Sequence, residues 1–187
     1  MPRVKGERRL EILKVLALML GEARWARITT AALAERLQVS EAALYRHFAS
    51  KAQMYEGLIE FSEQSVFGLA NRIASEEPEG AGQAVALVQM LLAFAEKNPG
   101  LVRVLTGEAL VGEHERLQAR VNQFFDRFEA TLKQSLRLAS DADASARAAV
   151  MLRYAIGSLQ LYVKSGFARS PLEAFNAQQG QLIARSG

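Results

Sequence analysis

The sequence contains no cysteine and only two histidines among its 187 residues. The absence of cysteine excludes disulfide bonds, thiolate metal ligands and a cysteine nucleophile. His47 lies in a basic helical segment and His114 stands among charged residues, so neither has the neighbours typical of a catalytic triad or a metal site. We therefore expect a protein that is not an enzyme and that needs no cofactor.

Long apolar runs are missing as well. The longest, residues 84–95, is interrupted only by Gln89; it is too short to span a bilayer and is typical of a buried helix. The N-terminus stays polar until Leu10, so we expect no signal peptide. Together with the lack of cysteine, these features predict a cytoplasmic protein that does not contact a membrane.

Strand-like alternation and internal repeats are also absent, whereas apolar residues recur at helical spacing along most of the chain. This pattern predicts an all-α fold of about nine helices, and a hydrophobic content of 50% is enough for a substantial core. We divide the chain into an N-terminal domain, 1–51, and a C-terminal domain, 52–187. The helices that we expect are 8–20, two short ones around a turn at 38–39, 50–76, 82–97, 101–105, 113–138, 143–168 and a last one from Pro171.

Residues 28–51 have the pattern of two short helices joined by a tight turn. A threonine at 29 or 30 can cap the first helix, the turn lies at Gln38-Val39, and Ser40 can cap the second. The second helix would bury Leu44 and Phe48. This is the helix-turn-helix arrangement, in which the second helix enters the DNA major groove. The alternative is an ordinary helical hairpin with a basic exposed face.

The distribution of charge favours the DNA-binding interpretation. Residues 1–51 carry ten Lys and Arg against five Glu, whereas residues 52–187 carry 13 basic and 15 acidic residues. The positive excess therefore lies in the segment with the helix-turn-helix pattern, as nucleic-acid binding requires. Residues 1–7 are polar and basic, and they are either an arm that touches DNA or a frayed terminus.

The run Val39-Ser40-Glu41-Ala42-Ala43-Leu44-Tyr45-Arg46-His47-Phe48-Ala49-Ser50-Lys51 resembles the helix-turn-helix of the TetR family. Gln38 departs from that pattern, because this turn position is most often glycine and tends to need a positive φ; glutamine there would cost about 1 kcal/mol. The DNA-binding residues that we expect are Thr29, Thr30, Ser40, Glu41, Ala42, Tyr45, Arg46, His47 and Lys51.

The last two long helices combine small and apolar residues, which suits a four-helix interface with a second copy of the chain. Helices that read a groove usually act in pairs on a palindrome. Both arguments predict a homodimer on palindromic double-stranded DNA, and several dimers on one site are compatible with this arrangement.

Phe61 lies off the apolar stripe of the helix expected at 50–76. It shares its face with Met54, Ser65, Gly68 and Arg72. An aromatic side chain beside an arginine on such a face is a candidate docking site for another protein. The alternative is contact with a neighbouring helix of the same chain.

The resemblance extends beyond the helix-turn-helix to a branch of the TetR family, the nucleoid occlusion factors. The segments that carry it are 11–13, 16–20, 27–30, 58–61, 98–101, 105–107 and 116–118. It implies a nucleoid-associated protein that binds palindromic chromosomal sites and, when bound, prevents the tubulin-like protein FtsZ from assembling a division ring. The alternative is the commonest role in the TetR family, a repressor that responds to a small ligand.

The same resemblance implies where FtsZ would bind. Its C-terminal tail is expected in a groove between the fourth and fifth helices, beside the DNA-binding domain. Lys97 stands where the relatives have arginine, which removes a planar hydrogen-bonding group. The residues expected to line this groove are Phe61, Leu69, Arg72, Met90, Ala93, Lys97 and Asn98.

Overall fold

The computed structural model describes residues 5–22 and 27–183. Arg3 and Trp25, which belong to the expected basic arm and to the loop after the first helix, lie outside the described residues. Within the described ranges the chain forms nine α-helices and one short 3-10 helix, without a strand, so the all-α prediction is confirmed. The elements are α1 Lys5–Leu20, α2 Thr30–Arg36, α3 Glu41–Tyr45, α4 Lys51–Glu76, α5 Gly80–Lys97, α6 Pro99–Leu105, η1 Glu108–Leu110, α7 Glu115–Leu138, α8 Ala144–Lys164 and α9 Pro171–Ile183.

Several helix ends differ from the expected ones. The first helix begins at Lys5 and the fifth at Gly80, each earlier than its apolar periodicity indicated. The eighth ends at Lys164 and not near residue 168, because Gly166 and Phe167 both adopt a positive φ (62° and 66°). A left-handed residue ends a helix by turning the chain away from its axis.

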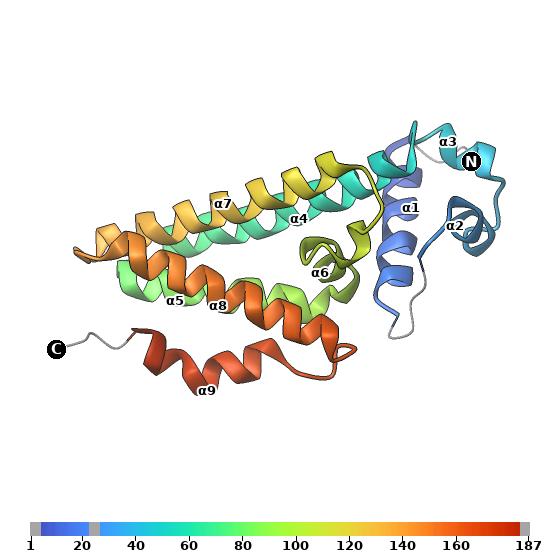
Figure 1. Cartoon of the computed structure of the whole chain (residues 1–187). Helices are drawn as coiled ribbons and strands as arrows, with labels where there is room; N and C mark the ends of the chain where they lie inside the picture. The colour runs from blue at the N-terminus through green and yellow to red at the C-terminus, as the bar shows by residue number, and fades with distance from the viewer. Residues whose placement is uncertain (1–4, 23–26, 184–187) are drawn as a thin grey trace.

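The molecule is elongated, with the head, formed by α1, α2 and α3, at one end (Figure 1). Two long helices, α4 and α7, pack against each other along the body, and α6 lies where the body meets α1 (Figure 1). The apolar helix α5 packs against α4, α7, α8 and α9, as expected for a central core helix.

The start of α4 is set by reciprocal capping. The Ser50 hydroxyl accepts the Gln53 backbone N–H (3.2 Å), and the Gln53 side-chain oxygen accepts the Ala49 N–H (2.8 Å). The sequence Ser50-Lys51-Ala52-Gln53 has the pattern of a capping box and predicts these bonds, except that the returning bond reaches the residue before the cap. At 1.5 Å per residue, the 26-residue helix spans about 39 Å from the head to the far end of the body.

The joint between head and body depends on close contact between α1 and α6. Gly100 of α6 lies so near α1 that an added Cβ atom would overlap the Ala17 carbonyl oxygen. Beside it the fully buried Arg103 donates to the carbonyls of Leu20 and Glu22, the last of which is 2.9 Å away.

Arg103 also joins the joint to the rest of the body. Its guanidinium pairs with Glu108 (3.1 Å) and lies over the Phe167 ring, 4.6 Å from the centroid. Burial lowers the pKa of Arg103 and the Glu108 carboxylate opposes that shift. The Arg103 side chain therefore links the end of α1 to η1 and to the turn after α8.

We predict that Gly100→Ala lowers the free energy of unfolding by about 3 kcal/mol, because the new methyl group has no space beside α1. The measurement is urea denaturation followed by circular dichroism. Gly68→Ala is the matched control: this exposed α4 glycine has open space around it, so the same change should stabilise by about 0.5–1 kcal/mol. Equal effects of the two substitutions would contradict the close-contact interpretation.

Candidate nucleic-acid interface and adjacent groove

The helix-turn-helix forms as predicted. Gln38 has a φ of 56°, and the turn is closed by N–H donation from Gln38 to Glu35 and from Val39 to Ala34, both at 2.9 Å. Ser40 then caps α3, its hydroxyl accepting the Ala43 N–H at 3.3 Å. The turn therefore has the left-handed residue that the family pattern requires, although the residue is not glycine.

The second helix is shorter than predicted. It ends at Tyr45, so Arg46 and His47 lie just after α3 and not within it. Phe48 is fully buried, as expected, but from the turn that leads to α4. The reason is local: Ser50 must be extended to cap α4, which leaves too few residues to continue α3.

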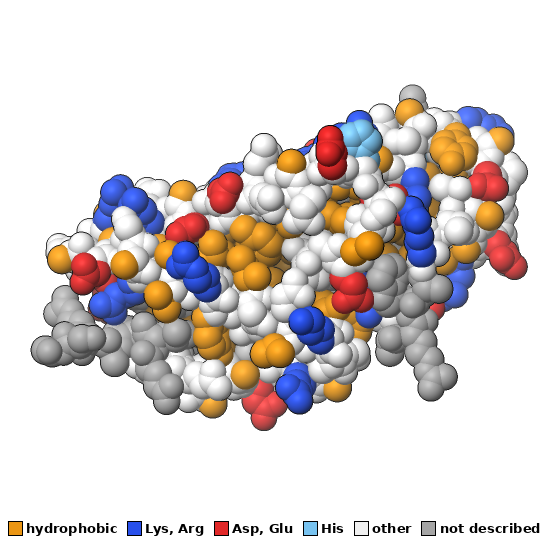
Figure 2. Space-filling view, viewed as in Figure 1, with side chains coloured by type: hydrophobic (Ala, Val, Ile, Leu, Met, Phe, Trp, Pro, Cys, Tyr) orange, Lys and Arg blue, Asp and Glu red, His pale blue; other side chains and the backbone are white. Residues whose placement is uncertain are grey.

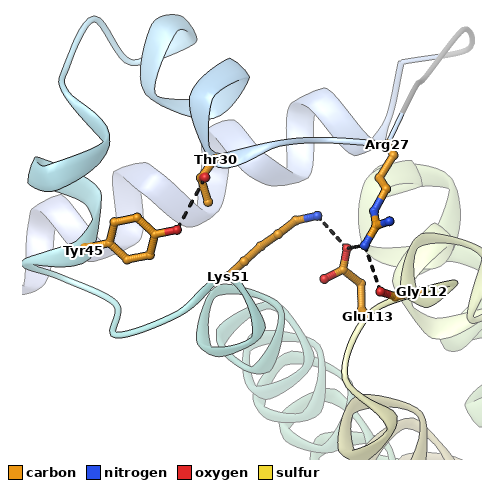
Figure 3. Close-up of polar contacts among 6 residues, drawn as sticks. All are labelled: Arg27, Thr30, Tyr45, Lys51, Gly112 and Glu113. Carbon is orange, nitrogen blue, oxygen red and sulfur yellow. Dashed lines mark hydrogen bonds and ion pairs between the residues drawn. The ribbon is translucent and has the colours of Figure 1, made fainter.

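Three of the expected DNA-binding residues, Thr30, Glu41 and Tyr45, form a hydrogen-bonded group across the two helices, of which Figure 3 draws Thr30 and Tyr45. The Thr30 hydroxyl donates to Glu41 (2.5 Å), and the Tyr45 hydroxyl lies 3.5 Å from the Thr30 oxygen. This group holds the start of α2 against α3 while the Tyr45 ring stays 46% exposed. Of the expected set, Thr29, Ser40, Glu41, Ala42, Tyr45 and Arg46 are exposed, and Thr30, His47 and Lys51 are half-buried.

Thr29 also has a structural role. Its hydroxyl accepts the Ala32 N–H at 3.1 Å and caps α2, which settles which of the two threonines is the cap. A DNA-binding effect of replacing Thr29 therefore includes a contribution from the loss of this cap.

Arg9 of α1 is a contact that the sequence did not indicate. Its guanidinium donates to the His47 carbonyl and lies over the Phe48 ring, 4.1 Å from the centroid. The Nδ1 atom of His47 is buried without a hydrogen-bond partner among the described residues. Arg9 thus fixes the segment after α3 from a position 38 residues away in the sequence, and no local pattern could have revealed it.

Lys51 is held by an acidic partner from the body (Figure 3). Its ammonium group lies 2.6 Å from an oxygen of Glu113, which also lies 3.4 Å from the Arg27 guanidinium. Arg27 donates to the Gly112 carbonyl as well, at 2.8 Å. Burial, and secondarily Glu113, raises the pKa of the neighbouring Tyr55 phenol, and Arg27 opposes this shift. Tyr55 is therefore neutral beneath this cluster.

An apolar groove of about 500 Å³ lies beside the head, between α1, the middle of α4 and the start of α6. Phe61, Lys97 and Asn98, expected to bind a partner, line this groove together. The Asn98 amide donates to the Phe94 carbonyl at 2.8 Å, which fixes its position at the end of α5. The residues that line the groove are Leu10, Leu13, Lys14, Ala17, Leu18, Gly21, Glu22, Leu58, Phe61, Lys97, Asn98, Pro99, Gly100 and Leu101.

The other expected members of the partner site lie elsewhere on α4 and α5. Leu69, Met90 and Ala93 are half-buried and Arg72 is exposed, and none of the four lines the groove. The opposite wall is formed instead by α1, whose Leu10, Leu13 and Leu18 the sequence did not indicate as partner-binding residues. Helical periodicity assigns a residue to a face but does not say which distant helix lies opposite that face.

The face of α4 expected to carry Phe61 also needs a correction. Met54 was placed on that outer face but is fully buried. Phe67, outside the predicted stripe, is buried too: its ring lies 5.4 Å from that of Phe124 and beneath the Arg127 guanidinium. Since α4 has helices on more than one side, its buried surface is wider than a single stripe.

Two family models cover most of the chain. Residues 12–58 match the bacterial regulatory proteins of the tetR family, and residues 83–186 match the SlmA-like, tetracyclin repressor-like C-terminal domain. Relatives named nucleoid occlusion factor SlmA, from Alteromonas mediterranea and Idiomarina loihiensis, are 47% and 48% identical to this chain. Those alignments cover 95% and 98% of this chain, and 95% and 100% of the relatives. The chain belongs to the SlmA family.

Solved structures place this SlmA-family chain in the TetR fold. The fatty acid degradation regulator FadR from Bacillus halodurans superimposes with a TM-score of 0.77 over 98% of both chains, at 14% identity. A TetR-like transcriptional regulator from Rhodococcus gives a TM-score of 0.74 over 99% of this chain and 100% of that chain, at 15% identity. At such low identity the likeness concerns the fold alone, and the predicted TetR-like architecture is confirmed.

In the described parts of the chain, no three His, Cys, Asp or Glu side chains gather where they could hold a metal ion. No helix in those same parts is long and apolar enough to cross a membrane. The named relatives are nucleoid occlusion factors and regulators, and neither description is that of an enzyme.

We predict that Thr29→Ala lowers the free energy of unfolding by about 1 kcal/mol, because α2 loses its cap. Thr29→Ser keeps the hydroxyl and should retain nearly all of the stability. Thermal denaturation of the two variants beside the wild type checks this. Equal melting temperatures for the alanine and serine variants would show that the cap contributes nothing.

Proposed function

We propose that this protein is a nucleoid occlusion factor. In this proposal a homodimer binds palindromic chromosomal DNA through its two heads and, once bound, antagonises FtsZ polymerisation, so that no division ring assembles over the nucleoid. The observation that carries the proposal is the position of the apolar groove, which adjoins a helix-turn-helix head in a chain of the SlmA family. Nucleoid association in the cytoplasm follows from this role.

The DNA-binding part is supported by the surface of the head. The exposed side chains of α3 and its two ends form the region that enters a major groove in helix-turn-helix proteins; they are Ser40, Glu41, Ala42, Tyr45 and Arg46. Thr29 at the start of α2 and Arg46 after α3 are exposed and suited to phosphate contacts, whereas the Tyr45 ring can contact a base edge or a thymine methyl group.

The homodimer is supported by an apolar face on α8. Val150 and Leu161 are 51% and 54% exposed, and Gly157 between them is open, so the three lie on one outward face. Apolar side chains also gather at the surface along the middle of the body in Figure 2. An apolar face with small residues suits packing against the same helix of a second copy. Several dimers on one DNA site remain part of the proposal.

The FtsZ part is supported by the chemistry of the groove beside the head. Phe61 is 44% exposed and Leu18 is 68% exposed, so an apolar segment would gain burial there. Lys14 and Lys97 add positive charge to the lining against the single carboxylate of Glu22. These features suit an extended peptide with apolar side chains and acidic groups. Leu69, Arg72, Met90 and Ala93 would belong to the partner site only if the peptide extends beyond this groove.

We predict that Tyr45→Ala weakens binding to a DNA duplex selected by the protein itself by about tenfold, since one base or phosphate contact is lost. The fold should stay intact, because the ring is exposed and its only described hydrogen bond is long. Fluorescence anisotropy measures the affinity and circular dichroism the fold. Unchanged affinity would show that Tyr45 is not part of the DNA-binding face.

The test of the whole proposal is sedimentation of FtsZ polymers with the protein, with and without the selected duplex. We predict loss of polymer only when the DNA is present. In Phe61→Ala this loss should be abolished at unchanged DNA affinity, because the groove loses its aromatic side chain.

Leu138→Ala is the matched control for this experiment. It also removes an exposed apolar side chain (67% exposed), but from the far end of α7, and it should behave as the wild type. Full antagonism by Phe61→Ala would rule out the groove. Tight DNA binding by the wild type without any effect on FtsZ would favour the ligand-responsive repressor instead and would call for a ligand screen.

A further inference from the structure

Glu113 occupies an unusual position for an acidic residue in a protein with a DNA-binding head. Its side chain is only 8% exposed, and a single carboxylate oxygen lies within ion-pair distance of both Lys51 and Arg27. Both cations belong to the head or its boundary, whereas Glu113 comes from the short segment between η1 and α7 (Figure 3). The cluster therefore joins the head to the body by charge.

The arrangement has the chemistry of an anion site. An ammonium and a guanidinium group converge on one oxygen atom, as they would on a phosphate oxygen, and Arg27 additionally holds the Gly112 carbonyl. Carboxylate and phosphate oxygens are alternative acceptors for the same pair of cations. We propose that Glu113 occupies, in the free protein, an anion site that a DNA phosphate takes over on binding, so that DNA opens an ionic latch between head and body.

This inference rests on the DNA-binding part of the proposed function. Displacement follows from charge, because a phosphate and the Glu113 carboxylate repel each other and cannot share the same two cations at contact distance. DNA supplies about one negative charge per 1.7 Å of its axis, a density that one carboxylate cannot match. Arg27 is 65% exposed, which leaves the site accessible from solvent.

The segment that carries Glu113, residues 111–114, is held in place by few polar contacts. Gly107 and Gly112 both adopt a positive φ on either side of η1, and Val111, which directly precedes Gly112, is 77% exposed. The Glu113 N–H makes one turn bond, to the Leu110 carbonyl at 2.9 Å. The described polar contacts between residues 111–114 and the head are those of Gly112 and Glu113 with Arg27 and Lys51.

The first experiment compares DNA affinity of the wild type with that of Glu113→Gln, which keeps the size of the side chain but removes its charge. We expect Glu113→Gln to bind about threefold to tenfold more tightly, because the phosphate no longer competes with an internal carboxylate. The gain should be similar for the selected duplex and for a duplex of random sequence, since a phosphate contact carries no sequence information.

Glu63→Gln is the matched control. It removes the same charge from a different ion pair, that of Glu63 in α4 with Arg120 in α7 at 2.8 Å, about three turns of α4 away from Lys51. Its affinity should stay within twofold of the wild type. A gain as large in Glu63→Gln would assign the effect to net charge and overturn the latch.

The second experiment needs no variant. Hydrogen exchange of the amides in residues 111–114 of the wild type should become faster when DNA is added, because the segment loses its partners on the head. Unchanged or slower exchange there would overturn the proposal, as would equal or weaker DNA binding by a folded Glu113→Gln. Absence of DNA binding by the wild type would overturn the proposed function itself, whereas binding without a gain in Glu113→Gln overturns the latch alone.

Discussion

The close contact between α1 and α6 is the constraint on which the rest of the structure depends. Because Gly100 lacks a side chain, the two helices approach each other at the distance of their backbones, and Arg103 then binds the carbonyls at the end of α1. A charged side chain is tolerated in this buried position because carbonyl oxygens, Glu108 and an aromatic ring surround it. The head is thus attached to the body through its first helix, and α2 and α3 are positioned from there.

This attachment has a consequence for function. Helix α1 forms one wall of the apolar groove and, through Arg9, also holds the segment after α3. Helix α1 therefore links the DNA-binding end of the molecule to one wall of the groove, and its close contact with α6 fixes that wall against the body. Helix α4 contributes Leu58 and Phe61 to the opposite wall of the groove. Since α4 begins at Lys51, the helices of both walls, α1 and α4, extend from the DNA-binding end of the molecule.

Local features of the sequence predicted much of this architecture, and long-range contacts account for what they missed. Capping by Ser40 and Ser50 and the positive φ of Gln38 depend on neighbouring residues, and all three were predicted. The pairing of Lys51 with Glu113 joins residues 62 apart, and that of Arg103 with Glu22 joins residues 81 apart. Periodicity carries no information about such pairs. The α1 wall of the groove and the ion pairs and hydrogen bonds of the head therefore could not be predicted from the sequence.

The same contacts change how the charge of the head should be interpreted. A count along the chain credits residues 1–51 with a net charge of five positive units, and this count already includes Glu22, the partner of Arg36. It does not include Glu113 of the body, which lies within ion-pair distance of both Lys51 and Arg27. Part of the positive charge is therefore neutralised internally before DNA arrives. Cations of the head that already pair with carboxylates contribute less to DNA affinity than the composition implies. Because DNA binding must break such pairs, it is coupled energetically to a change in the body.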